Sequence, residues 1–258
     1  MSQVVVFHGT EHRAGCTMTA LSVAELAAKE RKELVVLFAA LNGRRSTEYV
    51  SENSVSVDEF KIQLKSGMGI DKGMLSPSKK AENLYVIAGI GKEEEARHYF
   101  PDMAESMLQS LSGKFDLIVI DSGSDLDNGL AVGALRTKGL KYLIIEQTEG
   151  AVGRCEKMAE TYEKLGVSFD KYILSKCVEG DPYTVNYVSS RLAADKSSFL
   201  EVGYSDKGRL SEMEQRTLLE IGGDRYRGDI LKITNSVMEA MNLESISLKR
   251  KRTWNSFI

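Results

Sequence analysis

The sequence predicts an α/β fold: a doubly wound, mainly parallel sheet of about seven strands with helices on both faces. Short apolar segments rich in β-branched residues alternate along the chain with segments of helical periodicity. Several of the apolar segments are continuous rather than alternating, which is typical of parallel strands covered on both faces. The 258 residues include only three prolines and no linker rich in Pro, Gly and Ser. We therefore expect one domain over residues 1–245 and a short tail over 246–258.

The first 90 residues supply three strands and two helices. They are a strand at 3–8 (QVVVFH), a helix at 16–31, a strand at 33–41, a short helix at 57–67 and a strand at 83–89. Apolar residues from Leu21 to Ala27 recur at helical spacing in the second of these segments.

The rest of the chain continues the alternation. It contains a helix at 101–113, strands at 114–124 and 139–148, a helix at 150–166, strands at 169–177 and 198–204, and two C-terminal helices. The helix at 101–113 begins with proline and ends with glycine, as helices commonly do. The charged segment at 91–100 is predicted to be a solvated loop or the start of a helix.

Composition excludes several classes of protein. The net charge of −3 gives no overall attraction to nucleic acid, so we do not expect a nucleic-acid partner. Three cysteines without CxxC spacing suggest a reducing, cytoplasmic environment rather than disulfides or zinc. The three histidines share no spacing with cysteines or carboxylates, so we expect no metal site built on them.

The segment HGTEHRAGCT (8–17) joins the first strand to the first helix, where a phosphate-binding loop belongs. Such a loop uses backbone N–H groups, a lysine on the outer phosphates and a Ser/Thr hydroxyl on Mg²⁺. Gly9, Gly15 and Thr17 are present, but Cys16 stands where lysine is expected. From these residues alone the segment is equally a tight turn with Gly15 near the helix N-cap. Asp121, at the end of a buried strand, is either a Mg²⁺-associated carboxylate or a cap for the next turn.

Cys16 itself has two interpretations. A thiol in the first turn of a helix can acquire a lowered pKa and become reactive. More commonly a lone cysteine is a small apolar packing residue.

Across nearly the whole chain the sequence resembles the ParA/MinD (SIMIBI-class) family of deviant P-loop ATPases. AGCTMTALSVAELAA (14–28) is similar to that family's VGKTTTALNLAAALA, and FDLIVIDSGSDLDNG (115–129) to its YDYIIIDTPPGL. LIIEQTEGAVGRCEKMAETYEKLG (143–166) matches the strand and helix that follow. GYSDKGRLSEMEQR (203–216) resembles IPYDPRVREAEERG, with Gly203 at the family's proline. Four similarities in the right order imply the family's fold.

The departures from the family concern its charges. Aligned on Thr17, the two lysines of K-G-G-x-G-K-T fall on Glu11 and Cys16, and His12 and Arg13 replace glycines. The aspartates expected after the second strand are Ala39 and Leu41. The Walker A loop is thus degenerate, and we expect no efficient ATP hydrolysis.

The resemblance still implies a nucleotide site. ATP or ADP with Mg²⁺ would bind weakly to Gly9, Arg13, Gly15, Cys16, Thr17, Met18 and Asp121. Thr17 and Asp121 would hold the metal. Arg13, Arg44 and Arg45 are candidates for the missing positive charge, although GRR at 43–45 is equally a solvated loop.

Three functional hypotheses stay open. The first is a catalytically impaired ParA/MinD-like factor for localisation, assembly or regulation, with pilus assembly of the TadZ/CpaE type as one form. Because the degenerate loop starts at residue 9, we do not expect the receiver-like N-terminal domain that many such proteins carry. The second is an active ATPase with substitute basic residues, and the third is a domain that binds another small anion. We expect the protein to bind protein partners. Because Glu11 stands at the position of the signature lysine, we expect any homodimer to form without ATP.

The C-terminal tail carries a local positive charge. Four cations, Lys249 to Arg252, precede Trp254, Phe257 and Ile258. Some family members end in a basic membrane-targeting segment, which implies a weak, peripheral contact with anionic membranes. The alternative is a frayed tail or one packed on the domain.

Overall fold

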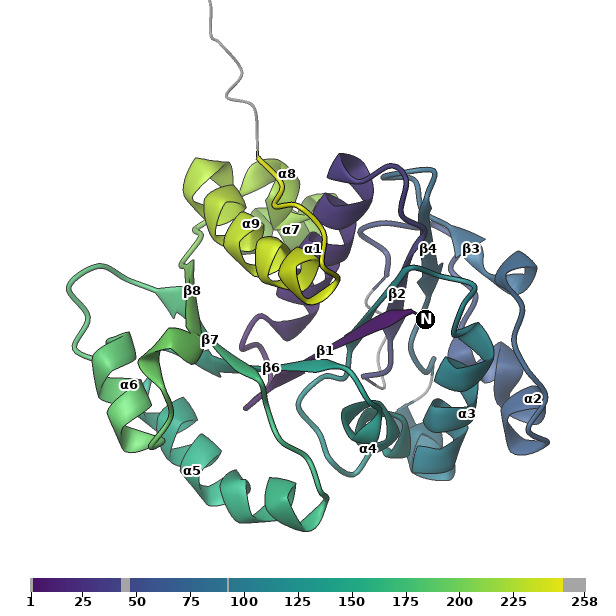
Figure 1. The fold of residues 1–258 in the computed structure, drawn as a ribbon, viewed down its shortest axis with the longest axis horizontal. Helices are drawn as coiled ribbons and strands as arrows, with labels where there is room; N and C mark the ends of the chain where they lie inside the picture. The colour runs from purple at the N-terminus through teal and green to yellow at the C-terminus, as the bar shows by residue number, and fades with distance from the viewer. Residues whose placement is uncertain (1, 43–46, 92, 248–258) are drawn as a thin grey trace, which may run out of the picture.

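The computed structural model describes residues 2–42, 47–91 and 93–247 (Figure 1). One eight-stranded sheet runs through it in the order β3-β4-β2-β5-β1-β6-β7-β8. The strands are β1 Gln3–Gly9, β2 Val36–Ala40, β3 Ser76–Pro77, β4 Leu84–Ile87, β5 Leu117–Asp121, β6 Leu140–Glu146, β7 Lys171–Cys177 and β8 Phe199–Gly203. All neighbouring strands are parallel except β3 and β4. This confirms the predicted mainly parallel sheet.

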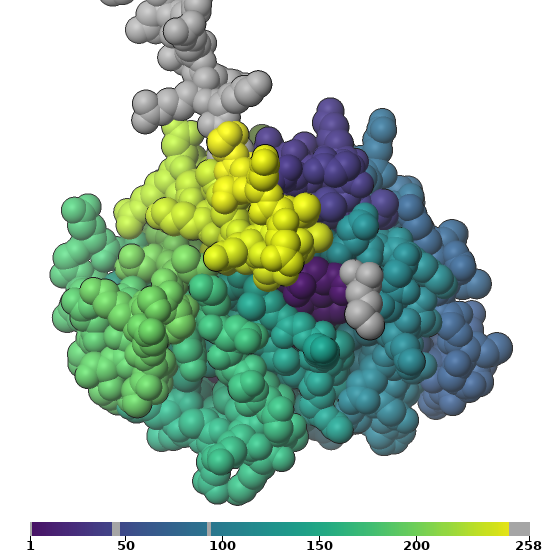
Figure 2. Space-filling model, in the orientation of Figure 1, coloured from purple at the N-terminus to yellow at the C-terminus, as the bar shows by residue number. Residues whose placement is uncertain are grey.

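Helices cover both faces of the sheet, as predicted for a doubly wound fold (Figure 1). The α-helices are α1 Cys16–Glu30, α2 Lys61–Lys65, α3 Pro101–Leu111, α4 Gly129–Arg136, α5 Glu149–Lys164, α6 Val185–Arg191, α7 Gly208–Glu214, α8 Leu218–Ile221 and α9 Gly223–Ala240. Short 3₁₀ helices are η1 Val57–Phe60, η2 Lys72–Met74, η3 Glu93–His98 and η4 Lys196–Ser198. Helices α1, α8 and α9 pack on one face, and α3, α4 and α5 on the other. On the first face the C-terminal helices lie against α1, as Figure 2 also shows.

Alternation along the strands divides the core into two layers. Val5 and Phe7 of β1 belong to the layer beneath α1 and α9, whereas Val6 between them belongs to the layer beneath α3 and α4. Side chains of successive strand residues point to opposite faces, so a continuously apolar strand is buried on both sides.

The structure differs from the prediction at the edges of elements. Strand β3 is an eighth strand that was not predicted, because two residues that include a proline carry no strand pattern. Pro77 is tolerated there because β3 lies at the sheet edge, where a missing backbone N–H costs little. The segment predicted at 33–41 forms a strand only over Val36–Ala40. Three helices rather than two follow β8. Within 91–100, η3 is a 3₁₀ helix.

The strand order places the predicted loop at the carboxyl edge of the sheet. β1 lies beside β5, with Phe7 in register with Asp121, and β5 lies beside β2, with Ala40 in register with the same aspartate. The chain segments that follow β1, β2 and β5 therefore leave the sheet side by side. That edge is where open parallel sheets bind ligands.

Candidate functional site

The loop between β1 and α1 is fixed to the ends of several strands. The Gly9 N–H donates to the Gly123 carbonyl at 2.8 Å, and the Thr10 N–H donates to the Ile144 carbonyl at 2.9 Å. The Ser175 hydroxyl donates to the Ala14 carbonyl at 2.7 Å. Contacts to the ends of β5, β6 and β7 thus hold the loop in one conformation.

The first turn of α1 has backbone N–H groups without partners inside the helix. Its N-cap, Gly15, has φ 93° and makes no side-chain capping bond, and no acidic residue lies in the first turn. Arg13 also has a positive φ, 65°, which is unfavourable for a residue with a Cβ. The N–H groups of Cys16, Thr17 and Met18 have no partner within an α-helix, so they suit an oxyanion.

Asp121 is the centre of a buried hydrogen-bond cluster. Its Oδ2 accepts from the Thr17 hydroxyl at 2.6 Å and from the Asn42 amide at 2.6 Å. Its Oδ1 accepts from the Gly123 N–H at 3.0 Å, so Asp121 also caps the turn after β5. Burial raises the pKa of Asp121, and the bond from Thr17 opposes that shift. Hydroxyl and carboxylate oxygens are ligands that Mg²⁺ prefers, so the Thr17–Asp121 pair fits this ion.

Cys16 is a packing residue. Its side chain is buried in the layer that contains Phe7 and Ala14. Burial, and then the neighbouring Asp121 carboxylate, raise the pKa of the Cys16 thiol well above its ordinary value. A thiol held in its neutral form is a poor nucleophile, so burial and the raised pKa favour the interpretation as an apolar packing residue.

Met18 contributes its side chain to packing rather than to the loop. Its Sδ accepts from the Leu218 N–H of α8 at 3.3 Å, and its carbonyl accepts from the Tyr226 hydroxyl at 3.4 Å. Only the backbone N–H of Met18 remains a candidate ligand group.

The charged side chains of the loop are Glu11 and Arg13. Glu11 is partly exposed and Arg13 is exposed, and neither has an ion-pair partner among the described residues. Arg44 and Arg45, the other predicted sources of positive charge, lie outside the described residues. The loop therefore carries one arginine, one glutamate and no lysine.

The structure adds Asn42 and His12 to the predicted site residues. Asn42 lies two residues after the end of β2, and its amide nitrogen lies 3.5 Å from the Thr17 hydroxyl and 2.6 Å from Asp121 Oδ2. His12 Nε2 lies 3.3 Å from the Asp125 carboxylate, and its Nδ1 lies 3.3 Å from the Ser124 hydroxyl. Position immediately after a buried strand was the only sequence signal for Asn42. His12 carried none, because its partners are more than 100 residues away.

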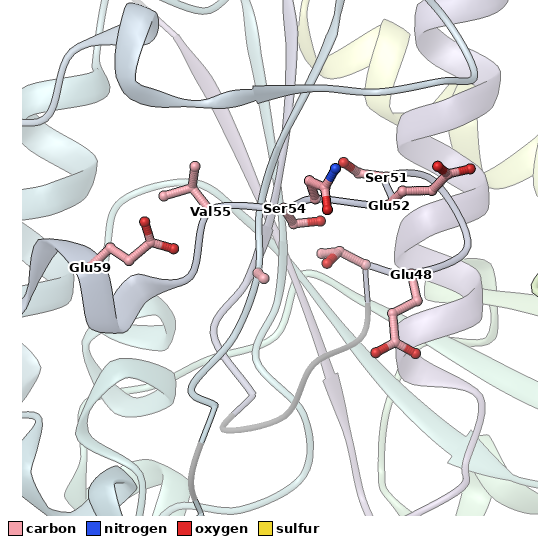
Figure 3. Close-up of a pocket in the computed structure, with 9 residues that line it drawn as sticks. Glu48, Ser51, Glu52, Ser54, Val55 and Glu59 are labelled. Atoms are coloured by element: carbon pink, nitrogen blue, oxygen red, sulfur yellow. The ribbon is translucent and has the colours of Figure 1, made fainter.

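A pocket of about 330 Å³ is lined by residues between 47 and 55, by Glu59 of η1 and by Ala88. Its carboxylates are Glu48, Glu52 and Glu59, and Figure 3 shows that they point in different directions. Lys79 pairs with Glu52, and Glu59 accepts from the Ser56 N–H. No cluster of three or more His, Cys, Asp or Glu that could hold a metal occurs in the part of the chain that the structure describes. This pocket therefore has no convergent ligand set.

Within residues 2–42, 47–91 and 93–247, no helix is long and apolar enough to cross a bilayer.

Comparison with known proteins identifies the fold. No protein-family model and no curated protein matches the sequence. Among solved structures, the septum site-determining protein MinD of Pyrococcus horikoshii, complexed with Mg-ADP, has a TM-score of 0.73 and 15% identity, over 93% of this chain and 97% of its own. A ParA family ATPase from Chlorobium tepidum has a TM-score of 0.77 and 13% identity, over 91% and 99%.

A third similar structure is a Cyanothece McdA–ATP complex, with a TM-score of 0.69 and 17% identity over 96% of this chain and 99% of its own. The chain therefore has the P-loop NTPase-like α/β fold of the MinD and ParA ATPases, as the sequence resemblance implied. At these identities the likeness concerns the fold alone.

Proposed function

We propose that this protein is a catalytically impaired member of the ParA/MinD group that acts as a localisation, assembly or regulatory factor. One observation carries the proposal: Thr17 and Asp121 lie 2.6 Å apart beside an uncapped helix turn, while Glu11 and Cys16 occupy the lysine positions. The chain keeps the groups that bind a phosphate and Mg²⁺ but lacks those that neutralise the transferred phosphate.

Weak hydrolysis follows from this charge balance. Phosphoryl transfer depends on positioning and on positive charge around the transferred group. The Cys16 side chain is neutral and buried, and the Glu11 carboxylate repels phosphate. Loss of one such cation costs about 3 kcal/mol or more of transition-state stabilisation.

Nucleotide binding is a separate, weaker property in this proposal. ATP or ADP would place its phosphates on the N–H groups of the Gly9–Met18 segment. When bound, Mg²⁺ would neutralise phosphate charge from its position on Thr17 and Asp121.

Calorimetric titration with Mg-ADP and Mg-ATP, beside a phosphate-release assay, tests the proposal. We expect weak binding that Thr17→Val and Asp121→Asn reduce, and phosphate release at background. The double variant Glu11→Lys/Cys16→Lys should bind nucleotide more tightly. Magnesium-dependent hydrolysis that Asp121→Asn abolishes would contradict it.

A second candidate is an active ATPase with a substitute cation. The exposed side chain of Arg13, without an ion-pair partner in the described residues, favours it. In that case Arg13→Gln would abolish measurable turnover. If neither nucleotide binds but another small anion raises the melting temperature, the loop serves the third hypothesis, an anion site of a different class.

The proposed assembly with other protein chains does not depend on nucleotide. The uncapped loop lacks the lysine that would reach across a nucleotide, so protein contacts alone would hold a homodimer or a complex with another protein. Among similar structures is a MinC:MinD cell division protein complex from Aquifex aeolicus. Pilus assembly of the TadZ/CpaE type remains one process that fits. Analytical ultracentrifugation with and without ATP tests this point: dimerisation that appears only with ATP would contradict it.

The C-terminal tail is the proposed site of membrane contact. The cations and aromatic residues at 249–258 lie outside the described residues, and we propose that they give a cytoplasmic protein of one domain a weak contact with anionic membrane. Vesicle co-sedimentation of the full chain and of a chain ending at Leu248 tests it. Equal binding by both would contradict the membrane role.

A further inference from the structure

A second pocket opens beside the loop at the carboxyl edge of the sheet. It has a volume of about 530 Å³, which is in the range of small-molecule sites. Its walls come from the β5–α4 connection, η3 and α5, and its polar lining includes His12, Arg97, Ser124, Asp125, Asp127 and Arg154. These residues come from four separate segments of the chain.

The two arginines are available to a ligand. Arg97 of η3 and Arg154 of α5 have exposed side chains, and neither has an ion-pair partner in the described part of the chain. By contrast, two acidic residues of α5 have ion-pair partners: Arg191 of α6 pairs with Glu149 at 3.0 Å and with Glu156 at 2.6 Å. Guanidinium groups bind phosphate through two parallel N–H bonds, which favours an oxyanion between them.

The carboxylates of the pocket differ in availability. Asp125 is engaged with His12 Nε2 at 3.3 Å, which leaves Asp127 as an exposed acceptor. The Ser124 hydroxyl adds a second small polar group, 3.3 Å from His12 Nδ1. A carboxylate accepts hydrogen bonds from hydroxyl groups, as acidic residues do with ribose in nucleotide sites.

We propose that this pocket binds a small hydroxylated phosphomonoester, such as a sugar phosphate or nucleoside monophosphate. Arg97 and Arg154 bind its phosphate, and Asp127 and Ser124 accept or donate at its hydroxyl groups. The ligand is an effector rather than the nucleotide of the β1–α1 loop, because none of the phosphate-binding amides of that loop is used. His12 of the loop and Asn42 of the Asp121 cluster both line this pocket, so occupancy of the pocket and the state of the loop share two residues.

Calorimetric titration of the full chain with ribose 5-phosphate, AMP and inorganic phosphate tests the proposal, with ribose and adenosine as uncharged counterparts. We expect the two phosphomonoesters to bind, inorganic phosphate to bind more weakly, and the uncharged compounds not to bind. Arg97→Gln/Arg154→Gln should weaken binding by about tenfold or more. Asp127→Asn should reduce affinity for ribose 5-phosphate but not for inorganic phosphate.

Two control variants separate this pocket from the loop. Arg209→Gln removes another exposed arginine, on α7, and should leave binding unchanged. Thr17→Val disables the proposed nucleotide site and should also leave ribose 5-phosphate binding unchanged. Binding that Thr17→Val abolishes and the double arginine variant does not would place the ligand in the loop and overturn the pocket proposal. Absence of binding by any phosphomonoester would overturn it too, without bearing on the loop.

Discussion

Helix α1 uses its polar groups differently at its two ends. At the first turn, Gly15 provides no side-chain cap and the backbone N–H groups face the loop without partners. Further along, Ser22 bonds Tyr226 at 3.1 Å, and the fully buried Glu25 accepts from the Thr217 hydroxyl at 2.7 Å and pairs with Lys29. The side chains of both ends are bonded within the chain, but the backbone N–H groups of the first turn have no partner within the helix.

We infer that the polar groups at the packed end of α1 have a structural role and those at the open end a functional one. Buried polar groups that stabilise a fold are satisfied internally, because an unpaired one costs free energy. The backbone strain of the region also lies at the first end, at Arg13 in the loop. We infer that the packed end of α1 anchors the helix so that the open end keeps its shape. The predictions below test each part of this contrast.

The largest effect is expected at the packed end. Lys29→Met removes the cation beside Glu25 and leaves a carboxylate that is fully buried. The free energy of unfolding should fall by about 3 kcal/mol or more, measured by urea unfolding. The double variant Glu25→Gln/Lys29→Met removes both charges and should recover most of the loss. A loss below about 1 kcal/mol for Lys29→Met would show that Glu25 needs no counter-charge.

A pH effect of similar size is expected in β1, beneath the loop. Burial lowers the pKa of His8 from 6.5 to about 4, and its Nδ1 lies 2.9 Å from the Ser122 hydroxyl. As the pH falls below 6.5, His8 of the unfolded chain binds a proton, whereas His8 of the folded chain does not bind one until about pH 4. Stability should therefore fall by about 3 kcal/mol between these pH values, while above pH 6.5 the residue has no such effect.

Urea unfolding at pH 7, 5.5 and 4.5 measures the His8 effect as the difference between the native chain and His8→Asn. His98→Asn, which replaces an exposed histidine, is the control and should keep the native pH dependence. Identical pH dependence of His8→Asn and the native chain would contradict the assignment.

Two glycines of the site should differ in their tolerance of a Cβ. Gly123 has φ 67°, and a Cβ there would lie 2.9 Å from the Asn42 Cβ, whereas at Gly15, with φ 93°, nothing lies within 4 Å. Gly15→Ala should cost about 1 kcal/mol from backbone strain alone. Gly123→Ala should cost about 2–3 kcal/mol, because it also displaces Asn42 from Asp121. Equal losses in thermal or urea unfolding would show that the Asn42 contact is dispensable.

The smallest effect is expected from the hydroxyl at the open end. Thr17→Val removes one donor to Asp121 and leaves the Asn42 amide, the Gly123 N–H and the Cys16 thiol, so it should lower the free energy of unfolding by about 1 kcal/mol. Thr17→Ser keeps the hydroxyl and is the matched control. A loss as large as that of Lys29→Met would mean that the open end is held as firmly as the packed end.

Much of the fold was predictable because its signal is local. Continuous apolar strands and helical periodicity identified β1, β5, β6 and β7 and the helices between them. Segments without such a signal were missed or misjudged, including the two-residue β3 and the break between α7, α8 and α9. Short elements are held by tertiary contacts, which leave no periodicity to read.

The candidate site was predictable in its position but not in its contacts. Gly15 and Thr17 are recognisable because a glycine turn and a hydroxyl at a helix start are sequence-adjacent features. Nothing near Asn42 indicates that its amide lies 2.6 Å from Asp121, 79 residues later.

The sequence by itself determined that a parallel α/β sheet would form, that a glycine loop would stand at its carboxyl edge and that residues 8–17 contain no lysine. Tertiary structure alone decided that Asn42, Thr17 and Asp121 meet, that Cys16 is buried, and that Glu25 is bonded to Thr217. The physical reason is that hydrophobic patterning acts over neighbouring residues, whereas these contacts depend on strand order and helix packing, which bring distant segments of the chain together.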